Sequence, residues 1–163
     1  MKVIFISICY FLVSLSTSMA QTVQESIIDE ELKIQFSPPK GWKTSKKDNG
    51  YLMGSPNTSG FMLIKEQDFS NIIKLKSAME SGIELADGSV MKPIGELNLL
   101  GDVGVSGMYL GIIDGTQMKG FLMALMPPSK GRAVICLSVA PEYLFNQTNM
   151  DELKTLLRSV IFL

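Results

Sequence analysis

The strongest constraint on the fold is a pair of long apolar runs separated by a short polar break. Residues 105–113 and 117–126 flank Asp114-Gly115-Thr116. Both Asp and Gly tolerate the positive φ that a tight hairpin turn needs. The break therefore predicts an antiparallel hairpin of two long strands. The next run, residues 132–140, is apolar on both faces, which is typical of a central strand covered on each side.

Shorter strands are expected before this hairpin. Residues 32–36 alternate apolar and polar side chains, as a half-buried strand does. Residues 51–54 and 61–65 flank a turn-rich connection and predict a second hairpin. Residues 90–100 are expected to be extended chain.

Two segments change to the helical period of about 3.6 residues. The first covers residues 70–86, with Asp68 or Ser70 as the expected N-cap. The second covers residues 149–161, where Asn149 and Glu152 resemble a capping box. Strands, one helix, more strands and a terminal helix indicate an α+β fold with a mainly antiparallel sheet.

The first 20 residues read as a cleavable secretory signal. Lys2 is followed by an apolar run, and Ser18-Met19-Ala20 supplies the small residues that precede a cut. No later apolar run approaches the roughly 20 residues of a membrane span. We therefore expect a signal peptide over 1–20, a flexible arm over 21–31 and one domain over 32–163. The expected location is the periplasm or the exterior of a bacterium.

Composition narrows the chemistry that this chain can perform. It has no histidine, so Ser-His-Asp, Cys-His and His-ligated zinc sites cannot form within it. Its 15 Lys and Arg against 16 Asp and Glu are scattered, whereas a nucleic-acid binder shows a basic stripe. We expect a protein that is not an enzyme, with no catalytic residue, cofactor, metal or nucleic-acid partner.

The mature chain would retain one cysteine. Cys9 lies in the signal, which leaves Cys136 without an intrachain partner. Its place in the central strand favours a buried core residue, and pairing between molecules is the alternative.

The string Phe-Ser-Pro-Pro-Lys-Gly-Trp over residues 36–42, the helix after the first strands and the ending Arg-Ser-Val-Ile-Phe over 158–162 resemble the PsbP-like superfamily. The bacterial exported domains of the DcrB kind fit best. The resemblance spans residues 31–162 and implies an α-β-α sandwich, with one antiparallel sheet and helices on both faces. It implies little about activity, because members of such a superfamily bind different partners.

Five side chains form the candidate surface for a partner or ligand. Trp42 and Tyr51 are aromatic residues of the kind that anchors protein interfaces, although Trp42 also suits the core. Met108, Met118, Met123 and Met126 cluster on the predicted hairpin, where thioethers suit core filling or an adaptable binding surface. If some face outward, they would hold an apolar ligand or partner. Met118 and Met126 share strand parity with Leu122, and these three complete the candidate set.

Other polar features favour structural roles. Asp87, Glu96, Asp102 and Asp114 lie near predicted loops, but no spacing pairs them as an acid and a base. Glycines 101, 104 and 107 precede a strand, whereas phosphate loops precede a helix.

These observations leave three hypotheses for function. The first is an exported, non-enzymatic domain that binds a protein or an envelope component. The second is a carrier of a small apolar ligand held between helix and sheet. The third is a hydrolase built on Ser and Lys, which needs a Lys with a lowered pKa beside the nucleophile.

Overall fold

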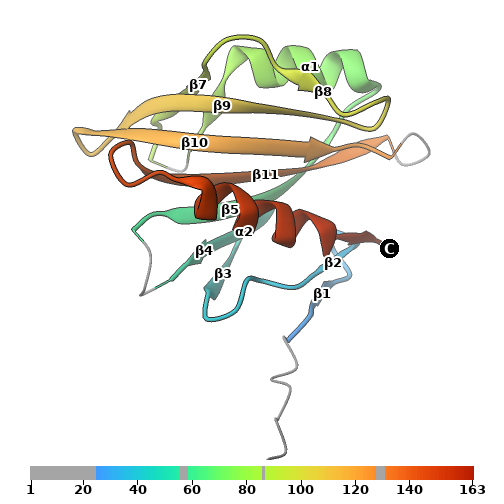
Figure 1. The fold of residues 1–163 in the computed structure, drawn as a ribbon. Helices are drawn as coiled ribbons and strands as arrows, with labels where there is room; N and C mark the ends of the chain where they lie inside the picture. Colours follow the sequence, from blue (N-terminus) through green and yellow to red (C-terminus); the bar gives the residue numbers. More distant parts are fainter. Residues whose placement is uncertain (1–24, 56–58, 86, 128–130) are drawn as a thin grey trace, which may run out of the picture.

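The computed structural model describes residues 25–163 except 56–58, 86 and 128–130, so the signal peptide expected over 1–20 lies outside the described residues. The main element of the described chain is one curled antiparallel sheet with the strand order β3-β4-β5-β11-β10-β9-β7-β6, and β8 pairs with β9 beside this path (Figure 1). Its strands are β3 (Lys43–Lys47), β4 (Gly50–Gly54), β5 (Phe61–Asp68), β6 (Ile83–Glu84), β7 (Val90–Pro93), β8 (Asn98–Leu99), β9 (Gly104–Ile113), β10 (Thr116–Leu125) and β11 (Arg132–Pro141).

The long hairpin at the centre of the sheet confirms the prediction from the Asp-Gly break. Strands β9 and β10 pair from Ile113–Thr116 to Gly104–Leu125. The turn consists of Asp114 at φ 47° and Gly115 at φ 75°. Two residues with positive φ are what a tight turn needs to match the twist of its flanking strands.

The predicted central strand is also confirmed. β11 pairs with β10 on one side and with β5 on the other. Side chains from Ala133 to Ala140 are all buried, and Cys136 is a free, buried cysteine as expected. The hairpin predicted from residues 51–54 and 61–65 is likewise present as β4 and β5.

Helix α1 (Ile72–Ser81) is shorter than the sequence predicts. The N-cap is Asn71, whose side chain accepts from the amide of Lys74. The helix ends at Gly82, where φ is 108°, and β6 starts at the next residue. A left-handed glycine stops the helix, although apolar spacing continues to residue 86.

Helix α2 (Gln147–Arg158) starts two residues earlier than predicted. Asn146 is the N-cap and accepts from the amide of Thr148, while the side chain of Asn149 accepts from the amide of Asn146. The predicted cap residue therefore takes part in the capping box as the returning acceptor, a role usually filled by Glu or Gln. Within the described residues, no helix is long and apolar enough to cross a membrane.

A second, three-stranded sheet joins the two ends of the domain. Its order is β1 (Ile27–Asp29), β2 (Ile34–Phe36) and β12 (Ile161–Phe162), all antiparallel. Residues 27–29 thus form a strand, although the sequence places them in a flexible arm. Arg132 holds this sheet to the large one, because its guanidinium donates to the carbonyl oxygens of Leu32 and Lys33 at 2.8 and 2.9 Å.

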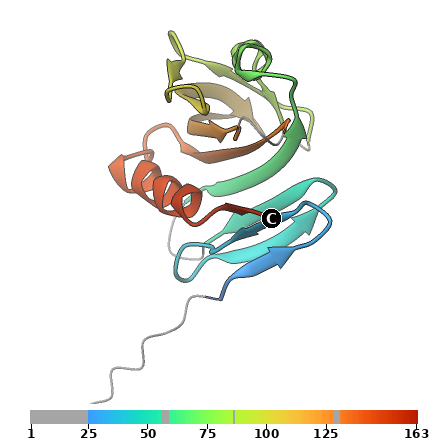
Figure 2. The same cartoon turned by 90° about the vertical axis from the view of Figure 1, so that its right-hand side faces the viewer.

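The predicted α-β-α sandwich with helices on both faces is wrong. The large sheet curls into a half-barrel (Figure 2), and α1 packs mainly on β7 and β9 near one end of the strand order. On the other face α2 packs on β10 and β11, and the small sheet shares its core. Strand curl and a second sheet thus replace the expected helix layers, because apolar residues over 27–36 and 160–162 pair as strands.

Candidate functional site

A groove lies on the open side of the half-barrel, on the face that α1 covers only in part. Its volume is about 610 Å³, which is within the range of sites that hold small ligands or short peptide segments. Its apolar lining includes Leu52, Phe61, Leu63, Leu85 and Ile113, with Tyr51 and Ile64 also at its border. The groove therefore brings β4 and β5 opposite the chain around β6 and the end of β9.

The apolar lining follows from the sequence of β4 and β5. Leu52 alternates with Tyr51 and Met53, and Leu63 alternates with Met62 and Ile64, so both strands are apolar on both faces. Met53, Met62 and Ile64 are buried in the core beneath α2 and the small sheet. The opposite face keeps Leu52 38% exposed, because no helix lies over it. A strand that is apolar on both faces but covered on one leaves an exposed apolar surface, which is a candidate interaction site.

Charged side chains line the two walls of the groove. The β4–β5 wall, together with the end of β3 and the turn after it, carries Lys47, Asp48 and Lys65, and the wall around β6 carries Glu84 and Asp87. Within the described part of the chain, Lys47, Lys65 and Glu84 have no ion-pair partner. Asp87 instead accepts from the amide and hydroxyl of Ser89, and these hydrogen bonds lower its pKa.

Trp42 and Tyr51 pack their side chains against the core on the other face of the sheet, although Tyr51 is also among the residues that line the groove. The indole Nε1 of Trp42 donates to Oε1 of Glu152 at 3.3 Å, and Trp42 packs against the core beneath α2. Tyr51 packs its ring against Phe36 with centroids 5.1 Å apart. Both aromatic residues are half-buried, and their contacts involve the small sheet and α2.

Asp29 is the most densely hydrogen-bonded side chain on that face. Its carboxylate is buried and accepts from the amide of Leu32 at 2.9 Å, the hydroxyl of Tyr51 at 2.6 Å and the ammonium of Lys46 at 3.0 Å. Burial is the largest single effect and would raise its pKa, but these three donors together lower the pKa to about 2. Burial and the bond to Asp29 raise the pKa of Tyr51 to about 12. The cluster fastens β1 to the edge of the large sheet.

Met118, Leu122 and Met126 are buried in the core on the α1 side, at 8%, 0% and 5% exposure. The structure therefore does not bring them together with Trp42 and Tyr51, which lie across the sheet. Met108 and Met123 of the same hairpin are half-buried. The fold thus uses most of the methionine cluster for packing.

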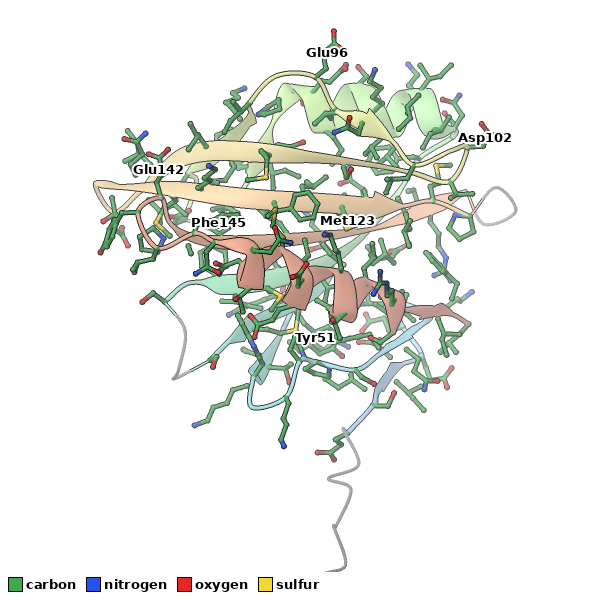
Figure 3. The ribbon with its side chains drawn as sticks, viewed as in Figure 1. Tyr51, Glu96, Asp102, Met123, Glu142 and Phe145 are labelled. Atoms are coloured by element: carbon green, nitrogen blue, oxygen red, sulfur yellow. The ribbon has the colours of Figure 1, made fainter. Side chains whose placement is uncertain are left out.

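The four candidate carboxylates lie in separate turns. Asp87 is in the loop after β6, Asp114 is in the β9–β10 turn, and Glu96 and Asp102 are exposed at different sides of the molecule (Figure 3). Among the described residues, no group of three or more acidic or cysteine side chains is placed to hold a metal ion.

The glycine run and Cys136 have structural surroundings. Gly104 lies in β9, and a Cβ there would collide with the carbonyl oxygen of Ala124 in β10. This glycine therefore permits close strand packing. Complete burial raises the pKa of the Cys136 thiol, which disfavours the reactive thiolate. Lys46 also differs from a catalytic lysine, because its hydrogen bonds to Asp29 and Glu31 raise its pKa.

Comparisons with known proteins give a fold likeness. No family model matches the chain, and no curated protein matches its sequence. The Saccharomyces cerevisiae Ran-binding protein Mog1p aligns with a TM-score of 0.57 at 6% identity, over 85% of this chain and 94% of that one. A mutant of protein Mog1 aligns with a TM-score of 0.56 at 7% identity, over 85% and 95% of the two chains.

A protein from Bacteroides thetaiotaomicron aligns with a TM-score of 0.54 at 12% identity. The match covers 85% of this chain and 48% of the other, so this chain spans about half the length of that protein. Identities this low establish a shared fold and do not carry function from one protein to another.

Sequence reasoning missed the groove, although one signal for it is present. Both 51–54 and 61–64 lack the polar residues that a half-exposed strand shows. That pattern requires cover on two faces. Which face stays partly open depends on the curl of the sheet and the position of α1. The spacing of apolar and polar residues within a strand predicts neither.

Proposed function

We propose that this chain is an exported, non-catalytic domain that binds a protein partner through the groove. The observation that carries this proposal is the lining itself: exposed and half-buried apolar side chains of two strands lie between walls of unpaired charge. Apolar centres with polar rims are typical of protein interfaces. Export rests on the signal-like residues 1–20 and the resemblance to exported PsbP-like domains. The Ran-binding protein Mog1p, which shares the fold, gives loose support for a protein partner.

Co-purification from the native envelope fraction tests this proposal. Leu52→Lys places a charge in the groove, and Leu99→Lys makes the same substitution at a leucine of β8 that is 56% exposed. We expect partner recovery to fall at least about tenfold in the Leu52 variant, because a charge must be desolvated on binding, and to be unchanged in the Leu99 variant. Equal recovery with both variants would show that the groove is not the binding site.

A small apolar ligand is the second candidate occupant of the groove. The volume of about 610 Å³ and the cluster of Phe61, Leu63 and Leu85 favour it. Native mass spectrometry of gently purified mature chain distinguishes the two candidates. A near-stoichiometric small-molecule adduct that is absent from the Leu52→Lys variant would support a carrier, and an adduct of protein mass would support the protein-binding domain.

A further inference from the structure

We infer that the groove accepts an extended segment of the partner as an added strand alongside β6, with apolar side chains in the groove and a basic residue opposite Glu84. This inference rests on the proposed function and specifies the chemistry of the partner. It depends on the edge of the sheet, the shape of the groove and the charges on its walls.

The first observation is that β6 ends the strand order of the large sheet. It pairs with β7 through Ile83–Met91 and Glu84–Val90, and none of the described strands pairs with its other side. Glu84 and Leu85 both line the groove. The edge of the sheet and the apolar groove are therefore contiguous, which is the arrangement that strand addition uses.

The opposite end of the sheet is protected. All five residues of β3 are exposed, and three of them are the lysines Lys43, Lys46 and Lys47. Charged side chains, lysine above all, keep edge strands from pairing with other chains. β6 has no lysine, and its polar residue is acidic. The two edges therefore differ in charge, and β6, with only two residues, offers an added strand a short stretch of backbone to pair with, so the groove must supply most of the other contacts.

The length of the groove suits an extended chain. Its β4–β5 wall follows β5 from Phe61 to Lys65, which at about 3.3 Å per residue is roughly 13 Å, or about four residues of an added strand. Alternate side chains of such a strand would point toward Leu63 and Leu85, and the others would face solvent. A helix with its side chains is about 10 Å wide and could not use the edge of β6.

The wall charges select among apolar segments. Glu84 has no ion-pair partner among the described residues, so a Lys or Arg at the neighbouring position of the added strand would gain a cross-strand pair. Lys65 on the facing wall is also without an ion-pair partner in that part of the chain, and it would repel a second basic residue there. The preferred segment is apolar, alternating and carries one basic side chain on the β6 side.

Phage-displayed random peptides provide the test, selected on the mature chain and counter-selected on the Leu52→Lys variant. We expect selected peptides to alternate apolar residues and to contain Lys or Arg. A synthetic copy should bind about fivefold more weakly to Glu84→Lys, because an opposite-charge pair becomes a like-charge pair. Glu96→Lys, the same change at an exposed glutamate after β7, should leave its affinity unchanged.

Methylation of single backbone amides of that peptide decides whether a strand is added. In a strand, only alternate amides donate to the neighbouring edge, and β6 has two residues, so methylation should weaken binding about tenfold at the peptide position that pairs with β6 and little at the adjacent positions. Groove-dependent binding without this position-specific loss would overturn strand addition and leave the groove as a protein site. Failure to select any peptide that discriminates against Leu52→Lys would overturn the inference, while the co-purification result judges the proposed function separately.

Discussion

The two faces of the large sheet are covered in different ways. On one face α2 and the small sheet bury Phe36, Ile64 and Leu153 completely, and a hydrogen-bonded Asp29 holds β1 in place. On the other face α1 covers the strands near one end, while Leu52 and Leu63 border a groove. Both faces hold a buried core, and on the α1 face Leu75, Tyr109 and Leu122 are also 0% exposed. The faces differ in that the α1 side leaves part of its apolar surface uncovered. Strands that are apolar on both faces therefore form a closed core where a helix and a second sheet lie over them, and a groove where no element does.

Truncation of a buried leucine on the closed face should have the largest effect. Leu153 of α2 is 0% exposed, and Leu153→Ala should lower the free energy of unfolding by about 2–5 kcal/mol through lost burial and a residual cavity. Leu52→Ala in the groove should cost less than about 1 kcal/mol. Urea denaturation of both variants measures the difference, and equal losses would contradict the contrast between the faces.

The N-cap of α2 should contribute more to the free energy of unfolding than the N-cap of α1. Asn146→Ala removes one half of a reciprocal capping box and should cost about 1–2 kcal/mol, whereas Asn71→Ala removes a single cap bond and should cost about 0.5–1 kcal/mol. Both side chains accept from backbone amides at helix starts, so the substitutions are matched. A larger loss for Asn71→Ala in urea unfolding would argue that α1 matters more to stability than α2.

Acid should weaken the closed face through Asp29. Its pKa of about 2 in the folded chain lies below the ordinary 3.8, so the folded state binds fewer protons than the unfolded state between these values. The stabilisation is present above about pH 3.8 and is lost as the pH falls through about 2. Asp29→Asn should flatten the loss of stability in this window.

Glu31→Gln is the control for that experiment, because Glu31 contacts the same Lys46 but its side chain is 76% exposed. Between pH 4 and 2, the free energy of unfolding of this variant should fall as steeply with pH as that of the wild type. A steep acid dependence that survives Asp29→Asn would assign the effect to other carboxyl groups.

The smallest effects on stability are expected in the groove. Leu52→Lys and Leu99→Lys both alter exposed leucines and should change the free energy of unfolding by no more than about 0.5 kcal/mol. Thermal denaturation at matched concentrations checks this. A large loss for Leu52→Lys alone would mean that the groove surface is part of the folding core.

Local patterns predicted those elements whose form is set by neighbouring residues. Asp114-Gly115 predicted the long hairpin, and the continuous apolar run around Cys136 predicted the central strand. The caps were harder, because Asn146 and Asn149 are both suitable and only the folded backbone shows which one starts α2.

The elements that depend on distant partners could not be predicted in this way. The arm over residues 21–31 looks polar and irregular as a whole, but its residues 27–29 pair with β2, which in turn pairs with Ile161–Phe162 at the other end of the chain. The groove depends on the curl of the whole sheet. Trp42 and Tyr51 were singled out by residue type, which does not reveal that their polar atoms bond to Glu152 and Asp29.

Photo-crosslinking in the native envelope tests the central claim most directly. A benzophenone amino acid replaces Leu52 in the groove or Ile28 on the outer side of the small sheet, which is 58% exposed. We expect the Leu52 position to yield a discrete crosslinked protein product and the Ile28 position to yield none. Crosslinking to the same protein from Ile28 alone would place the partner on the closed face and contradict the account.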